Sequence, residues 1–168
     1  MKWVLFTGTW RLADKAVEAD VRSSVREVFG RGDAIVTGGA TGVDYYAMDE
    51  AVKLEPSCKR LRIILPTTIE GYILDSRNNW CQAPVTALDI DLLEALLNKI
   101  KEVNPASMLE MPHSNITQEH YYHRDTEEVK YADSVYAFQV NNSKGTQDTI
   151  DKAKAAGLPI TLHKKYTI

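Results

Sequence analysis

The sequence predicts an α/β protein with a Rossmann-like, doubly wound and mainly parallel sheet that carries helices on both faces. Short apolar runs alternate with amphipathic segments of helical spacing, and several of the runs end in glycine. The length of 168 residues is typical of one compact domain, so we expect a single domain over residues 1–168. A less regular segment at about 66–117, rich in proline, is predicted to be a helical insertion.

The first part of the chain predicts three strands and two helices. Each strand is a short apolar run, as expected for a strand buried on both faces, and each helix repeats apolar residues three or four positions apart. In order they are a strand at 2–7, a helix from the N-cap Asp14 to Gly30, a strand at 34–37, a helix at 43–54 and a strand at 61–65.

The remainder of the chain returns to regular alternation after the irregular segment. Inside that segment, apolar residues predict an amphipathic helix at 89–103, and a short strand is expected at 108–111. A helix at 118–131, a strand at 134–140, a helix from its N-cap Thr146 to Ala156, and a strand at 159–163 follow.

Composition narrows the class of protein. The chain is 44% hydrophobic with a mean hydropathy of -0.29, and no apolar run approaches the roughly 18 residues of a membrane span. Cys58 and Cys81 lack metal-ligand spacing, so we expect a reduced, cytoplasmic protein without a cofactor. The net charge of -3 offers no general attraction for nucleic acid, which only a local basic patch would bind.

The glycine-rich turns are the main candidates for ligand binding, because ligands of such folds bind where parallel strands end. Small residues let a ligand approach the backbone, whose N–H groups bind phosphate at a helix start. The alternative for each turn is a structural role alone, or a solvated loop. The first three turns with unusual chemistry contain Gly8, Thr9 and Arg11; Gly38, Gly39, Ala40, Gly42, Val43 and Asp44; and Ser143, Lys144, Gly145 and Thr146.

A fourth candidate feature precedes the strand at 134–140. Arg124 and Asp125 are expected to face the cleft, with neighbouring tyrosines as a stacking surface for a base. His120 and His123 have the spacing of metal ligands on a helix, but the sequence supplies no third ligand, so no metal is predicted.

Three stretches carry a resemblance to a known family. TGGATGVDYYA, RDTEEVKYADSVYAF and NNSKGTQDTIDKAKAAGLPI resemble the linked signatures of the SLOG superfamily, which joins the Lonely Guy phosphoribohydrolases to the DNA-processing protein A family. The resemblance implies a Rossmann-like fold that binds nucleotides or their derivatives. It also implies that the phosphate or sugar contacts Gly38, Gly39, Gly42, Ser143, Gly145 and Thr146. Thr149 stands where the phosphoribohydrolases have a catalytic glutamate, a departure from their pattern.

Taken together, these features predict a protein that binds a nucleoside monophosphate or an ADP-ribose-like molecule. If it is an enzyme, the expected reaction is hydrolysis of an N-glycosidic bond, with Asp44, Asp125 and Asp148 as the candidate carboxylates. A nucleotide sensor or sponge without catalysis, and a single-stranded DNA binder, are the alternatives. A homodimer is also compatible, since related folds often build their site at a dimer face.

Overall fold

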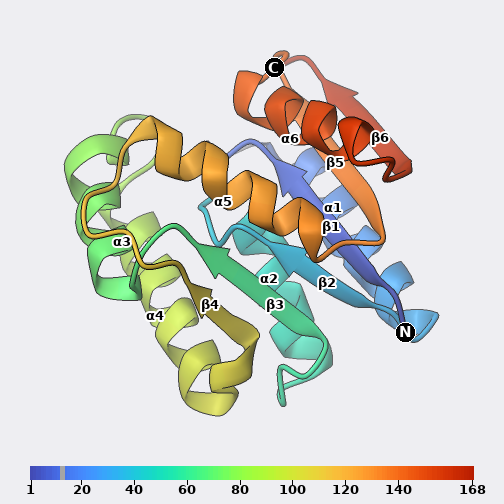
Figure 1. The fold of residues 1–168 in the computed structure, drawn as a ribbon, viewed down its shortest axis with the longest axis horizontal. Helices are drawn as coiled ribbons and strands as arrows, with labels where there is room; N and C mark the ends of the chain where they lie inside the picture. Colours follow the sequence, from blue (N-terminus) through green and yellow to red (C-terminus); the bar gives the residue numbers. More distant parts are fainter. Residues whose placement is uncertain (12–13) are drawn as a thin grey trace.

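The protein is a six-stranded sheet with helices on both faces (Figure 1). A computed structural model describes residues 1–11 and 14–168. All paired strands are parallel, in the order β4-β3-β2-β1-β5-β6, which confirms the predicted doubly wound α/β fold. In chain order the elements are β1 (Trp3–Gly8), α1 (Lys15–Gly30), β2 (Ala34–Thr37), α2 (Val43–Leu54), β3 (Leu61–Leu65), α3 (Ile69–Asp75), the π-helical turn η1 (Ser76–Trp80), α4 (Ala87–Val103), the 3-10 turn η2 (Pro105–Ser107), β4 (Met108–Glu110), α5 (Gln118–Lys130), β5 (Ser134–Val140), α6 (Lys144–Ala155) and β6 (Ile160–Tyr166).

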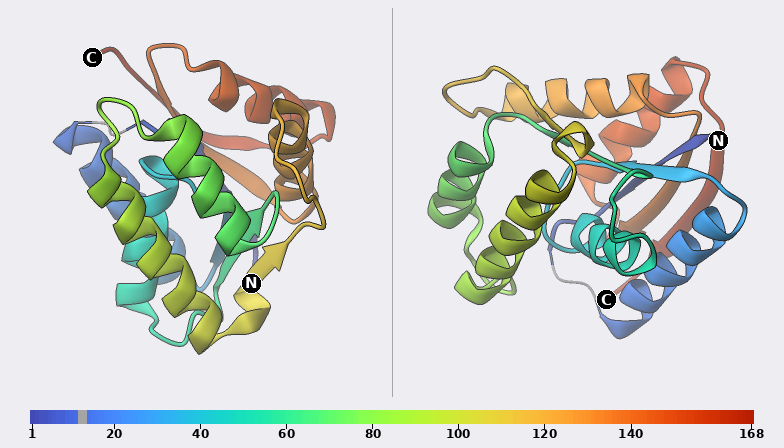
Figure 2. Two further views of the ribbon diagram at one scale, coloured as in Figure 1. Left: turned by 90° about the vertical axis from the view of Figure 1, so that its left-hand side faces the viewer. Right: turned by 90° about the horizontal axis from the view of Figure 1, so that it is seen from below.

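The helices divide between the two faces of the sheet (Figure 2). Helices α1, α2 and α4 cover one face, whereas α5 and α6 cover the other. From β1 the chain winds outward to β4, and it then returns through α5 to place β5 on the other side of β1. The strand order therefore reverses between β1 and β5, which is where open α/β sheets bind their ligands.

Side chains of the central strand alternate between two apolar cores. Val4 and Phe6 of β1 pack beneath α1 and α2, while Leu5 points to the opposite face with Val129 of α5 and Ile150 of α6. This alternation follows from the two-residue period of a strand. It explains why β1 is apolar at four consecutive positions, 3–6, rather than at every second one.

Residues 66–117 contribute to the sheet itself. Strand β4 was predicted at 108–111 and pairs with β3, with Met108 opposite Ile63, so the segment connects two neighbouring strands. Helix α3 was not predicted. It begins where the Thr68 hydroxyl accepts a hydrogen bond from the Gly71 N–H, and it buries Tyr72 with its isoleucines.

Two predicted helix starts can be compared with the structure. The Asp14 carboxylate accepts hydrogen bonds from the N–H groups of Ala16 and Val17, which confirms it as the N-cap of α1. Helix α4 begins at Ala87, two residues before the predicted start, because Thr86 and Asp89 form a reciprocal capping box.

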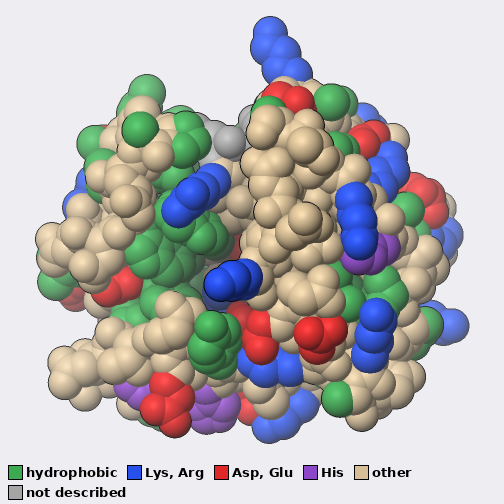
Figure 3. All heavy atoms as spheres, turned by 90° about the horizontal axis from the view of Figure 1, so that it is seen from above, with side chains coloured by type: hydrophobic (Ala, Val, Ile, Leu, Met, Phe, Trp, Pro, Cys, Tyr) green, Lys and Arg blue, Asp and Glu red, His purple; other side chains and the backbone are tan. Residues whose placement is uncertain are grey.

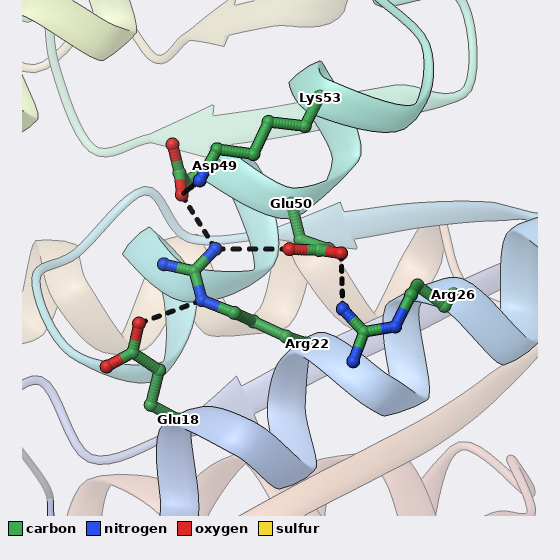
Figure 4. A network of polar contacts seen from close by, with 6 residues as sticks. All are labelled: Glu18, Arg22, Arg26, Asp49, Glu50 and Lys53. Atoms are coloured by element: carbon green, nitrogen blue, oxygen red, sulfur yellow. Dashed lines mark hydrogen bonds and ion pairs between the residues drawn. The ribbon is translucent and has the colours of Figure 1, made fainter. Parts of the chain in front are cut away.

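A network of ion pairs joins α1 to α2 (Figure 4). Arg22 is its centre: its guanidinium lies 2.8 Å from Glu18 and 2.6 Å from Asp49. Arg26 pairs with Glu50 at 2.6 Å. The pairs are partly exposed, so each contributes little stability, although together they fix how the two helices pack.

Within the part of the chain that the structure describes, no helix has the length and apolar character needed to cross a membrane.

The two cysteines are both free thiols. Cys58 is buried and Cys81 is exposed.

Candidate functional site

Two adjoining cavities open at the carboxyl end of the sheet. Figure 3 looks onto this side of the molecule, where hydrophobic side chains gather along one side of a hollow. The inner cavity has a volume of about 100 Å³ and lies at the reversal point between β1 and β5, and the outer one measures about 570 Å³. Trp10, Ser143 and Gly145 line both. The inner wall consists of Thr7, Gly8, Trp10, Ala40, Asp44, Trp80, Arg124, Asp125, Glu128, Ser143, Gly145, Thr146 and Thr149, and the outer wall of Thr9, Trp10, Arg11, Asp14, Pro84, Val140, Asn141, Ser143, Lys144, Gly145 and Ile168.

Arg124 of α5 is the central charge of the inner cavity. Its Nε donates a hydrogen bond to Oδ1 of Asp125 at 3.0 Å and lies 3.5 Å from Oε1 of Glu128. Its Nη1 donates to the carbonyl oxygen of Gly38, so α5 is tied to the turn after β2. The side chain is only 11% exposed, and its position is therefore fixed by these partners.

Asp44 adds a third carboxyl group from the first turn of α2. Its Oδ2 accepts a hydrogen bond from the backbone N–H of Ala40 at 3.1 Å. Burial raises the pKa of Asp44 to about 6, against the opposing influence of the Arg124 guanidinium and of the bond from Ala40. The carboxyl group therefore holds or releases a proton near neutral pH.

The other two carboxyl groups are shifted in the same direction. Burial raises the pKa of Asp125 and raises that of Glu128 well above its ordinary value, although Arg124 opposes both shifts. One guanidinium cannot neutralise three carboxylates, so the cluster keeps protons at a pH where isolated carboxyl groups have lost theirs. Buried acids of this kind, placed in a cavity, are typical of catalytic sites.

The start of α6 forms the boundary between the two cavities. Ser143, rather than the predicted Thr146, is the N-cap, because the Ser143 hydroxyl accepts from the N–H of Thr146 and the helix begins at Lys144. A Cβ built on Gly145 would meet nothing within 4 Å, so the backbone here is open to the cavity. An open helix start next to Lys144 is a site for an anion.

The glycines of the turn after β2 lie behind the cavity wall. A Cβ on Gly38 would stand 2.3 Å from Nη1 of Arg124, and one on Gly39 would meet Leu65 and Ile63. Gly42 has a φ of 71° and lies against the carbonyl oxygen of Thr9. Val43 is buried in the core beside Gly8. Four residues predicted as ligand contacts therefore line neither cavity in this structure: Gly38, Gly39, Gly42 and Val43. Gly8, Ala40 and Asp44 line the inner cavity.

The structure does not bring Asp148 into the cluster. Its carboxylate pairs with Lys152 one turn along α6, and its side chain is 32% exposed. Thr149 of the same turn is buried and lines the inner cavity. Thr9, Arg11 and Lys144 lie around the outer cavity, as expected for residues of the first and third turns.

Several residues that line the cavities were not predicted, and three of them carry the chemistry discussed below. Glu128 lies one turn beyond Arg124 on the same face of α5, and helical spacing from Arg124 indicates this position. Trp80 comes from the π-helical turn that follows the unpredicted α3. Trp10 stands between the predicted residues Thr9 and Arg11.

The predicted histidine pair has a third neighbour. His113 stacks on His120 with 4.0 Å between ring centroids and lies 5.4 Å from His123. Over residues 1–11 and 14–168, no group of three histidine, cysteine or acidic side chains is arranged to hold a metal ion.

Fold and site together define a Rossmann-like α/β protein with a polar cavity at the switch point of its sheet. The sequence matches no family model and no curated protein. Among solved structures, the chain is similar to DNA processing protein A from Helicobacter pylori, described with a single-stranded DNA binding mode, at a TM-score of 0.67 and 17% identity over 95% of this chain. It is also similar to a structural genomics target called TM1055, at a TM-score of 0.56 and 15% identity over 95% of this chain and 72% of that one.

A third similar structure is DNA processing protein A from Streptococcus pneumoniae, at a TM-score of 0.52 and 12% identity over 97% of this chain. The chain spans 63% of the Helicobacter protein and 59% of the Streptococcus protein. At these low identities the likeness shows a shared fold, the fold that the sequence motifs led us to expect.

Proposed function

We propose that the protein binds a nucleotide, with the phosphate at the start of α6 and the sugar above the inner carboxyl groups. The observation that carries this proposal is the polarity of the double cavity. The outer part has Arg11, Lys144 and the open backbone at Gly145, and the inner part has the acidic cluster around Arg124. An anionic group is favoured in the outer cavity and disfavoured in the inner cavity. This difference orients a ligand that has a phosphate at one end.

The acidic cluster further supports hydrolysis of the N-glycosidic bond. In the proposed reaction, water attacks the anomeric carbon while the bond from this carbon to the base nitrogen breaks. The base leaves with the electron pair and takes a proton from Asp44, and the water gives its proton to the Asp125 carboxylate. The sugar passes through a cationic state, which neighbouring carboxylates stabilise.

Base release is the measurement that tests this reaction. We expect the purified protein to release free base from a nucleoside 5′-monophosphate, detected by chromatography. Asp44→Asn, which keeps the shape but cannot supply the proton, should lower the rate by about 10²-fold or more. Asp148→Asn is the matched comparison, because Asp148 lies outside both cavities and acts on Asp125 only as a neighbouring charge, so its loss should change the rate far less than the loss of Asp44.

Two outcomes would contradict the catalytic step. Equal loss of rate in the Asp44 and Asp148 variants would remove Asp44 from its role. Stabilisation by nucleotide without any released base, measured as a shift of Tm, would leave a binding protein of the sensor or sponge type.

The pH dependence of base release is a separate expectation. A proton donor works only while it is protonated, and burial raises the pKa of Asp44 to about 6. The rate should therefore decline as pH rises through about 6. It should also fall at lower pH, where Asp125, the proposed base, takes up a proton. A profile that rises between pH 6 and 8 would show that Asp44 acts in its ionised form.

Single-stranded DNA is the second candidate ligand, favoured by the fold shared with the Helicobacter pylori protein. Its backbone phosphates would use the same cationic outer cavity. Affinity for an oligonucleotide that falls steeply with salt, and that is lost in Lys144→Met, would favour this candidate. If a mononucleotide competes for the same site, nucleotide binding is the favoured function.

A further inference from the structure

An aromatic wall stands opposite the polar floor of the double cavity. The Trp10 and Trp80 ring centroids are 5.3 Å apart, and Trp80 lies 4.8 Å from the ring of Tyr121 on α5. Trp10 lines both cavities and Trp80 the inner one. Both indoles are half-buried, so each presents part of its ring to the cavity and part to the core.

The position of Trp80 is set by a local irregularity of the backbone. The chain leaves α3 through one π-helical turn, Ser76–Trp80, a type of turn that is frequent at functional sites. Asp75 supports the turn: one of its oxygens accepts a hydrogen bond from Nδ2 of Asn79 at 2.7 Å, and the other accepts from the Tyr121 hydroxyl. These bonds hold Trp80 against α5 and toward Trp10.

One face of Trp10 already accommodates a flat polar group. The Arg11 guanidinium lies over this ring, with Cζ 5.0 Å from the centroid. A nucleobase is also a planar group, and stacking on indole is sequence-tolerant because every base has a π-face. Pro84, Val140 and Ile168 also give the outer cavity apolar surface, but the indoles of Trp10 and Trp80 are the aromatic part of the two linings and therefore suit a flat base.

We infer that Trp10 and Trp80 form the stacking surface for the base, and that they make the site select nucleotides over base-free sugar phosphates. This inference rests on the proposed nucleotide binding and assigns its selectivity. It also gives a role to the segment after β3, whose π-helical turn supplies Trp80 and whose Pro84 lines the outer cavity.

The test compares two probes, adenosine 5′-monophosphate and ribose 5-phosphate, by calorimetric titration of the full chain. Asp44→Asn is the common background of all the proteins compared, so that the nucleotide is not hydrolysed during the titration. With both tryptophans in place, the protein should bind the nucleotide at least about tenfold more tightly than the sugar phosphate. Trp10→Leu and Trp80→Leu should each remove about tenfold of nucleotide affinity and leave the affinity for ribose 5-phosphate unchanged. Trp3→Leu is the control, because Trp3 lies at the start of β1, at the opposite end of the strand from the site.

The outcomes separate the two proposals. If both probes bind equally and the tryptophan variants leave their ratio unchanged, the stacking role is wrong while phosphate binding stands. If neither probe binds the protein with both tryptophans in place, the nucleotide proposal fails together with the stacking role. Trp80→Phe keeps an aromatic ring in the packed position, so retained affinity in this variant, with loss in Trp80→Leu, separates stacking from unfolding.

Discussion

Replacing Arg124 with methionine is expected to lower the free energy of unfolding by about 3–5 kcal/mol at pH 8. The substitution removes the charge that faces Asp125 and Glu128 and the donor that satisfies the Gly38 carbonyl oxygen. The loss should be smaller at pH 5. Burial raises the pKa of both carboxyl groups, so a larger fraction of them is protonated at the lower pH and less charge is left without a partner. Urea unfolding at the two pH values measures both effects.

The control for this prediction is Lys130→Met on the same helix. Lys130 pairs only with Glu127, its side chain is 62% exposed, and its removal should cost less than about 1 kcal/mol. Adding Glu128→Gln to the Arg124 variant should restore part of the lost stability by removing one uncompensated charge. An Arg124 variant as stable as the control at pH 8 would show that the cluster is hydrated and not held by its cation.

Gly42→Ala is expected to destabilise the protein by about 3 kcal/mol or more. Two effects add: a φ of 71° is unfavourable for any residue with a Cβ, and this Cβ would stand 2.4 Å from the carbonyl oxygen of Thr9 and 2.9 Å from that of Arg11. The carbonyl groups belong to the loop that presents Trp10, so any folded fraction should also bind ligand less tightly. Thermal unfolding combined with nucleotide titration measures both.

Gly30→Ala provides the comparison, because a Cβ at Gly30 meets nothing within 4 Å and the residue ends a regular helix. It should leave stability unchanged or raise it by up to about 1 kcal/mol. If the Gly42 variant matched the Gly30 variant, the close approach between this turn and the loop after β1 would not exist in solution.

Regular elements with a clear period were predictable from the sequence. The buried strands and the amphipathic helices α1, α4 and α6 follow from spacing alone, and even the short β4 was expected near its observed place. Helix α3 was not, because it has only seven residues and includes Gly71. A short helix owes its existence to burial of Tyr72 against the core, which local preference does not reveal.

The site was partly predictable for a related reason. Asp44 and Ser143 were predicted from turns that follow strands and Asp125 from the helix before β5, and all three line the inner cavity. The turn after β2 was predicted to expose its backbone to a ligand. Instead, the space above Gly38 is filled by the guanidinium of Arg124, which lies 86 positions later in the chain. Glu128 was not predicted as a site residue, because a glutamate on a helix is usually solvated. Contacts between distant segments decide both cases, and no local pattern encodes them.

The place of β1 in the sheet has a consequence for the order in which the molecule assembles. One edge of β1 pairs with β2, some 30 positions away, but its other edge must wait for β5, where Leu5 lies beside Val135. Closing so long a loop is entropically costly, and topologies of this kind fold slowly. During synthesis, the polypeptide thus holds an unpaired edge of its central strand until most of the chain has left the ribosome. Because α5 and α6 supply cavity residues, the cavity cannot be completed before these helices have been synthesised.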